Sequence, residues 1–218
     1  MKVWRQIAWG WMALTLTCAA PPAFPAPGSR NAALADLSHA EAGRRAEAVA
    51  WLAEHGRNAD QPRLLARLRD DDPDVRGLAE QALWRLWMRS GDAKVDRLMQ
   101  AGVEQMQAGR RAEAIATFTE IIRRKPGFAE GWNKRATVHY LAGNLKASLA
   151  DCDQVMKRNP HHFGALSGYG QIYFQLEDLD KAVAYWKRAL DVNPNMPGVE
   201  LNLRAAEALL ARKRQRSI

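Results

Sequence analysis

Cysteine is scarce in this chain of 218 residues, which holds Cys18 and Cys152. Cys18 lies in an N-terminal segment that we expect to be cleaved, so Cys152 would be the one thiol that remains. A single thiol cannot form an internal disulfide, and the sequence therefore excludes a small fold held together by disulfides. Cys152 stands at an apolar position of a repeated pattern, which indicates packing rather than chemistry.

Long hydrophobic runs are also missing. The most apolar stretch, Ile7 to Ala20, carries no charge but is too short to span a bilayer comfortably. Lys2 and Arg5 precede it and small residues follow, which is typical of a cleaved secretory signal peptide. We therefore expect residues 1–20 to be a signal peptide of bacterial type and the protein to be exported to the periplasm.

The cleavage site is expected between residues 19 and 26, and residues 21–30, rich in proline, alanine and glycine, read as a flexible lead-in. A lipid anchor through Cys18 is the disfavoured alternative. The preceding residues 15–17 (Thr-Leu-Thr) lack the leucine and small residue at the positions where lipoprotein signals usually have them.

Catalytic and metal-binding motifs are absent from the sequence. It has no glycine-rich phosphate loop, no nucleophile elbow and no histidine–glutamate zinc motif. The histidines are His39, His55, His139, His161 and His162. The last two adjoin in a turn, but no further ligands lie near them in sequence. We therefore predict no enzyme activity, no cofactor and no metal, with an unrecognised catalytic site as the weakest alternative.

Charge of one sign is limited. With 32 basic and 24 acidic residues the net charge is +8, and both signs are mixed along most of the chain, as on solvated helix faces. The basic cluster at residues 212–216 is the exception. It could stabilise a helix end, or attract a membrane surface or an anionic polymer. No aromatic residue interleaves with it, which disfavours nucleic acid as a partner.

A repeat is the strongest feature that is present. Pro126, Pro160 and Pro194 stand 34 residues apart and close the units 93–126, 127–160 and 161–194. A fixed period of this size predicts stacked helical hairpins, each unable to bury its apolar face alone. Equivalent positions of the first helices carry small residues, Gly102, Ala136 and Gly170, which let paired helices approach closely. Small residues of the second helices are expected to face that contact, and a later core position is filled by other side chains. The facing set is Ala114, Ser148 and Ala182, and the core set is Phe118, Cys152 and Trp186.

This register resembles the tetratricopeptide repeat, three times over without gaps. The resemblance implies an all-α, right-handed helical-hairpin solenoid whose first helices line a concave groove. Arg135 and His139 depart from the pattern, because they stand at positions that Tyr169 and Tyr173 fill in the third unit. The groove positions are Met99, Val103, Met106, Asn133, Thr137, Tyr140, Ser167, Gln171 and Phe174.

The expected groove is uncharged, and Asp96 and Glu130 at its edge would favour a basic ligand. The alternative is that some of these residues pack against neighbouring helices. Some proteins of this family hold a peptide's terminal carboxylate with basic and amide side chains. The matching positions here are Met99, Val103, Lys134, Gly164 and Gly168, so that clamp does not carry over.

Residues 31–90 are helical in pattern and resemble HEAT repeats, most clearly over residues 64–87. We expect one helix to start at Ser38, with Glu41 completing a capping box, and to end at Gly56. Asp72 is expected to cap a second helix that begins at Pro73. Its buried stripe would be Leu78, Ala82, Leu83 and Leu86.

Residues 195–218 read as a capping helix and a basic tail. Together these features predict a non-catalytic scaffold or adaptor of the cell envelope that binds a protein or peptide partner in the concave groove. The alternative is an electrostatic adaptor to a membrane surface or an anionic polymer through the basic tail, with weak membrane contact. Added salt should weaken the second kind of binding much more than the first.

Overall fold

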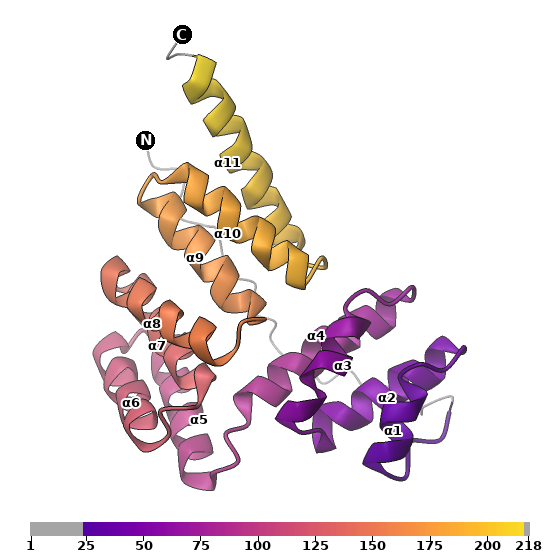
Figure 1. Ribbon diagram of the computed structural model, residues 1–218. Coiled ribbons are helices and arrows are strands. Elements are labelled where there is room, and N and C mark those ends of the chain that lie inside the picture. Colours follow the sequence, from indigo (N-terminus) through magenta and orange to yellow (C-terminus); the bar gives the residue numbers. More distant parts are fainter. Residues whose placement is uncertain (1–23, 216–218) are drawn as a thin grey trace.

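The computed structural model describes residues 24–215, and the regular elements in that range are helices (Figure 1). The expected signal peptide and the last residues of the basic tail lie outside the described residues. Residues 30–88 form an N-terminal module. Its elements are α1 (Arg30–Asp36), α2 (Ala42–His55), a short 3-10 helix (Asn58–Asp60), α3 (Gln61–Arg67) and α4 (Pro73–Met88).

The start of α4 follows the sequence prediction. The Asp72 carboxylate accepts hydrogen bonds from the backbone amides of Asp74 (2.9 Å) and Val75 (3.1 Å). Pro73 occupies the first helical position, where its missing N–H costs nothing. This cap fixes the direction in which α4 leaves the loop.

The start predicted for α2 is wrong, because the helix begins at Ala42 and not after Ser38. Residues 38–41 form a turn instead. The Arg45 guanidinium donates hydrogen bonds to the carbonyls of His39 (2.9 Å) and Ala40 (2.8 Å), which stabilises the non-helical conformation of the turn. The C-terminal end of α2 lies at Gly56, as the sequence indicated.

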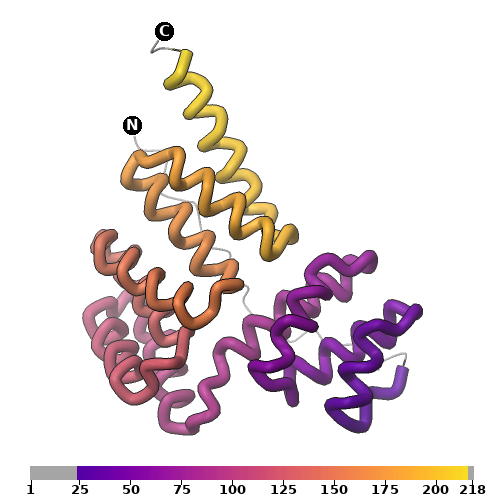
Figure 2. Tube along the Cα trace, viewed as in Figure 1, coloured from indigo at the N-terminus to yellow at the C-terminus, as the bar shows by residue number. Residues whose placement is uncertain are grey.

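The rest of the described chain is a stack of hairpins that confirms the predicted helical-hairpin solenoid. Figure 2 shows the tube folding back on itself in each unit, with the N-terminal module beside the stack. The pairs are α5 (Ala93–Gln107) with α6 (Arg111–Arg124), α7 (Ala129–Leu141) with α8 (Leu145–Arg158), and α9 (Phe163–Gln175) with α10 (Leu179–Val192). Helix α11 (Pro197–Gln215) packs on α10. Within the described residues, no helix is long and apolar enough to cross a membrane.

Small residues bring the two helices of a hairpin together, as the register predicted. A Cβ atom on Gly102 would lie 2.6 Å from the Phe118 ring, and one on Gly170 would lie 2.4 Å from the Trp186 ring. Both distances are shorter than real Cβ contacts, so any larger residue would force the ring to shift, which favours glycine at both positions. Phe118 and Trp186 are completely or almost completely buried and form the centres of their units.

Arg135 shows how the second unit accommodates its departure from the pattern. Its guanidinium makes a bidentate pair with Asp151 of α8 (2.7 and 2.8 Å) and donates to Thr119 of α6 (2.9 Å). Asp151 is almost wholly buried. In this unit an ion pair therefore replaces the aromatic contact that Tyr169 makes in the third unit.

The N-terminal module docks on the hairpin stack far along the sequence. Phe163, at the start of α9, belongs to the same core cluster as Leu83 and Trp87 of α4. The Asn195 side chain, in the loop before α11, donates to the Leu68 carbonyl at 2.7 Å. The module thus contacts the second and third repeat units, which determines how much of the groove stays open.

Candidate peptide-binding surface

The repeat-one part of the predicted groove is packed against other helices. Met99 and Met106 are 2% and 6% exposed and belong to the core cluster that contains Phe118. Val103 is half-buried against the same cluster. These side chains therefore act as core residues in this structure, and a role in ligand contact stays a prediction that would require them to become exposed.

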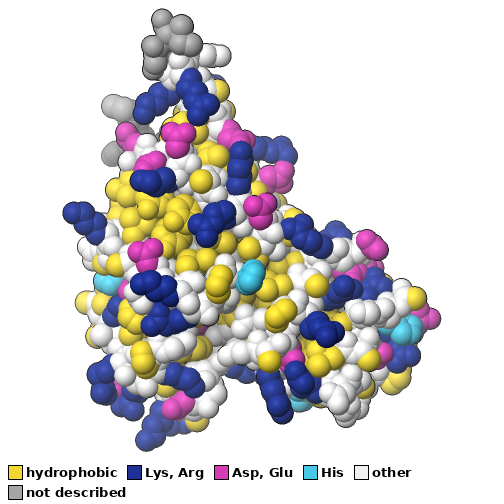
Figure 3. Space-filling view, viewed as in Figure 1, with side chains coloured by type: hydrophobic (Ala, Val, Ile, Leu, Met, Phe, Trp, Pro, Cys, Tyr) yellow, Lys and Arg dark blue, Asp and Glu magenta, His cyan; other side chains and the backbone are white. Residues whose placement is uncertain are grey.

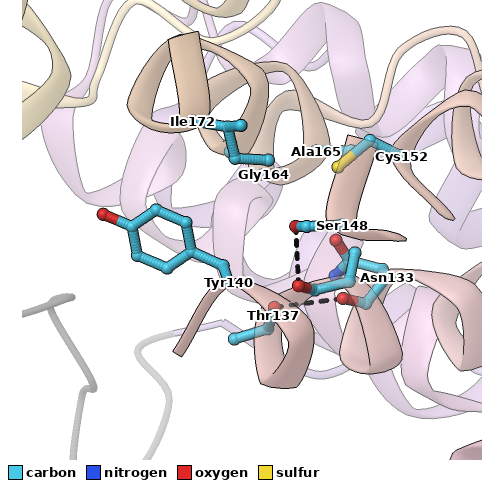
Figure 4. Close-up of a pocket in the computed structure, with 10 residues that line it drawn as sticks. Asn133, Thr137, Tyr140, Ser148, Cys152, Gly164, Ala165 and Ile172 are labelled. Atoms are coloured by element: carbon cyan, nitrogen blue, oxygen red, sulfur yellow. Dashed lines mark hydrogen bonds between the residues drawn. The ribbon is translucent and has the colours of Figure 1, made fainter. Parts of the chain in front are cut away.

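The second and third units leave an open depression between α7 and α9 (Figure 4). Thr137 and Tyr140 lie on one side, and Gly164 and Gly168 on the other, with Cys152 at the base. A Cβ atom on Gly168 would still be 4.0 Å from the Cys152 sulfur, so the glycine leaves unfilled space. The depression offers about 10 Å³ to a water-sized sphere, close to the minimum for one water. A depression of this size can receive part of a side chain of a bound peptide but is too small to enclose a cofactor.

Tyr140, which lines this depression, is hydrogen-bonded to Gln171 of the neighbouring first helix. Burial raises the pKa of the Tyr140 phenol, and a hydrogen bond with the Gln171 side chain partly offsets the shift. Thr137 donates its hydroxyl to the carbonyl of Asn133 (3.0 Å), which leaves its methyl group for contact. The Phe174 ring packs against the Trp186 ring, with the ring centroids 5.6 Å apart. This half of the surface is uncharged.

The predicted groove residue Asn133 is engaged in a buried polar cluster around Glu130. The Glu130 side chain is fully buried, and its carboxylate accepts from Asn133 (3.1 Å) and pairs with Lys134 (3.1 Å). The Nε2 atom of His162 lies 2.9 Å from the other carboxylate oxygen. Burial opposes ionisation of Glu130, but Lys134, His162 and Asn133 outweigh it and lower its pKa to about 2. Glu130 is therefore a buried carboxylate held ionised by its partners.

His162 also caps α9. Its Nδ1 atom accepts a hydrogen bond from the backbone amide of Ala165 (3.1 Å). Because Nδ1 is the acceptor, the proton of the neutral ring must be on Nε2, which donates to Glu130. The start of α9 is thus tied to α7 through one imidazole.

Two tryptophans of α4 cover this cluster. The Trp87 ring stacks on His162 with centroids 4.3 Å apart, and the Trp84 ring meets it edge-on at 5.5 Å. The Lys134 ammonium lies 5.8 Å from the centre of the Trp84 ring. A Cβ atom on Gly164 would lie 2.4 Å from Trp84. Trp84 therefore fills the space at Lys134 and Gly164, two of the positions that the sequence comparison with the tetratricopeptide repeat matched to the carboxylate clamp.

Half of the acidic edge expected to favour a basic ligand is buried. The Glu130 carboxylate is inside the protein and paired with Lys134. Asp96 is half-buried and accepts hydrogen bonds from the Ser90 amide (2.9 Å) and hydroxyl (2.5 Å). The expectation of a basic ligand therefore rests on Asp96 alone and stays a prediction. Figure 3 shows basic and acidic side chains interspersed on the visible face, with an apolar patch over the α9–α10 hairpin.

Cys152 lines the depression, but its thiol is expected to be unreactive. It is 3% exposed, and burial raises the pKa of its thiol to about 12. The thiolate is therefore a negligible species near neutral pH. In the part of the chain that the structure describes, no group of three or more His, Cys, Asp or Glu side chains could hold a metal ion.

Sequence reasoning missed Trp84, Trp87 and the buried pair of Glu130 and His162. A signal for the tryptophans existed: they stand at i and i+3 on a helix whose predicted stripe lay elsewhere. A second apolar face on one helix indicates a second packing partner. Nothing in the sequence pointed to which of the later units that partner was.

Family models agree with the geometry of the stack. Models of the tetratricopeptide repeat match residues 99–160 and 165–196. The hairpin region of this chain therefore carries tetratricopeptide repeats, as the 34-residue register indicated. The HEAT-like resemblance of the N-terminal module stays a prediction.

Curated relatives match part of this chain. A TPR repeat-containing protein of Rhizobium etli is 34% identical over 126 residues, which are 58% of this chain and 62% of that protein. The Hsp70-Hsp90 organizing protein of Triticum aestivum is 26% identical over 145 residues, 66% of this chain and 23% of that protein. The chain thus spans less than two thirds of either relative.

Solved structures share the fold. The first TPR domain of Spaghetti (RPAP3), bound to an HSP90 peptide, has a TM-score of 0.53 at 24% identity and covers 55% of this chain and 96% of its own. The TPR domain of P58(IPK) has a TM-score of 0.51 at 16% identity and covers 85% of this chain and 53% of its own. At these identities the likeness concerns the fold.

Proposed function

We propose that this chain is a non-catalytic scaffold that binds an extended segment of a partner protein on the open half of its concave surface. The observation that carries the proposal is the uncharged depression between α7 and α9, lined by Tyr140, whose hydroxyl is hydrogen-bonded to Gln171 of α9. It joins apolar contact area to side-chain hydrogen-bonding groups and encloses no cavity for a substrate. Similar repeat domains have been solved with HSP90 and Hsp70 peptides, which supports a peptide as the kind of ligand.

The ligand's terminal carboxylate would not be the anchor. Lys134, the one basic residue at the matching clamp positions, is paired with Glu130 and covered by Trp84. An internal segment therefore fits this surface better than a chain end. The proposed setting is the cell envelope, on the strength of the expected signal peptide.

The test is crosslinking and mass spectrometry of the protein in its native envelope, with Gly168→Leu compared with the wild type. The leucine would fill the depression, since no atom lies within 3.4 Å of the added Cβ. Gly77→Leu, on the exposed face of α4 with nothing within 4 Å, is the matched control. We expect Gly168→Leu, and the double variant Tyr140→Ala, Gln171→Ala, to lose partners that the control keeps. An unchanged partner set would contradict the proposal.

The electrostatic adaptor stays the alternative. Helix α11 extends through Gln215, so residues 212–214 form its last turn, and Arg214 lies 3.5 Å from Asp180. Binding through this turn should fall steeply between low and high salt, because exposed charges are screened within about 10 Å at 0.1 M salt.

A further inference from the structure

Helix α11 occupies the place of a first helix in a fourth repeat. Val199 and Leu203 stand 34 residues after Ala165 and Tyr169, and all four side chains are buried. The same shift places Leu201, Ala205 and Ala208 at the positions of Ser167, Gln171 and Phe174. The structure shows α11 packed on α10, and the repeat register places these three residues on the side of α11 that corresponds to the concave side of α9.

The two outer faces of α11 differ in chemistry. On the face that a second helix of the unit would cover, Glu200 and Arg204 stand 34 residues after Leu166 and Gly170, and they pair with each other. This charged face ends the stack. On the concave face, Leu201 is 69% exposed, the largest value among the exposed large hydrophobic residues of the described chain. Ala205, Ala208 and Leu209 are exposed beside it, so the exposed apolar side chains form a strip along the helix. A contiguous apolar strip, unlike a single exposed leucine, marks a candidate contact site.

The positively charged side chain of Arg212 lies at the C-terminal end of the same face of α11. Arg212 follows Leu201 by 11 residues, which returns to the same side of a helix about 16 Å further on. Arg204, Lys187 and Arg214 all have acidic partners, whereas Arg212 has no ion pair among the described residues. Glu130, the acidic residue of the second unit at the predicted groove edge, is buried and paired with Lys134, so its charge does not offset that of Arg212.

We propose that α11 is part of the binding surface and selects a segment with an apolar side chain and a carboxylate side chain about five residues apart. The apolar side chain contacts Leu201 and the carboxylate pairs with Arg212. The spacing follows from about 16 Å divided by about 3.3 Å per residue of an extended chain. This inference rests on the proposed function, since it extends the same surface.

The experiment is the selection of peptides that bind the full-length protein from a phage-displayed library of random linear dodecapeptides. The enriched peptides are then synthesised and their affinities measured by fluorescence polarisation. We expect enriched sequences to combine a Leu, Ile, Phe or Trp with an Asp or Glu at the stated spacing.

Site-directed variants locate the contact. Leu201→Glu should weaken binding about tenfold or more, because burial of one large apolar side chain is lost. Arg212→Glu should weaken it about threefold and reduce its salt dependence. The matched controls are Leu176→Glu, in the turn after α9 at 49% exposure, and Arg111→Glu, exposed at the start of α6. Circular dichroism checks that each variant is folded.

The outcomes separate the two proposals. Peptides that need the space at Gly168 but bind Leu201→Glu as tightly as the wild type would overturn this inference and leave the proposed function standing. Enriched peptides that are basic or lack a carboxylate would also overturn it. A library that yields no binder would contradict both.

Discussion

Substitution of Glu130 by glutamine should reveal a buried charge that the fold depends on. Glutamine keeps the shape of the side chain but cannot balance Lys134, so the variant imitates the protonated carboxyl group. The pKa of Glu130 is lowered from 4.5 to about 2. A shift of this size corresponds to about 3 kcal/mol of folding free energy, at about 1.4 kcal/mol per pKa unit.

The sign of the pH dependence follows from the direction of the shift. Because the folded-state pKa is below the unfolded one, the stabilisation is fully present above pH 4.5 and is lost as the pH falls towards 2. The free energy of unfolding of the wild type should therefore exceed that of Glu130→Gln by about 3 kcal/mol at pH 6, and the difference should approach zero near pH 2.

Urea unfolding followed by tryptophan fluorescence between pH 2 and 7 measures this difference, since Trp87 stacks on His162 beside the cluster. Glu120→Gln is the control. The pKa of Glu120 is also lowered to about 2, by hydrogen bonds from Arg123 and Arg124, but that group lies at the surface, where solvent screens the pairs. Equal effects of the two substitutions, or a Glu130→Gln effect that does not change with pH, would refute the reasoning.

Three further predictions concern single positions. Glu177 has φ of 61° at the turn position where the second unit has Gly143 at 78°; Glu177→Gly should stabilise the fold by about 0.5–1 kcal/mol and Gly143→Ala should destabilise it by about 1 kcal/mol in urea unfolding. Gly170→Ala should cost about 1–3 kcal/mol, whereas Gly168→Ala should gain about 0.5–1 kcal/mol, and a thermal melt that ranked them in the other order would contradict the packing argument. The Cys152 thiol should resist alkylation at pH 8 until the chain unfolds, as followed by peptide mass spectrometry, and rapid labelling of folded protein would contradict its burial.

The hairpin stack could be predicted because the same local problem recurs in each unit. Each hairpin needs a small residue where its helices touch and a core side chain nearby, and the sequence shows Gly102 and Phe118 at such positions. The structure adds that these two residues contact each other. Capping of α4 by Asp72 was predictable for the same reason, since it depends on neighbouring residues only.

The open part of the surface could not be predicted, because it depends on contacts between distant segments. Leu78 of the stripe predicted on α4 is only half-buried, whereas Trp87 is 5% exposed, since docking on α9 buries a second face of that helix. The same docking covers Lys134 and the space at Gly164. Local periodicity identifies the faces of a helix but not the partner of each face.

The docking of α4 also bears on how the chain unfolds. In a simple repeat array each unit contacts only its neighbours, so the ends can melt independently and unfolding can spread from unit to unit. Here Trp84 and Trp87, which precede the first unit, contact residues of the second and third. These contacts join the N-terminal module to units that are distant in sequence, so separation of one unit also breaks contacts made by a distant segment. The chain should therefore behave as one cooperative unit, with few partly melted forms.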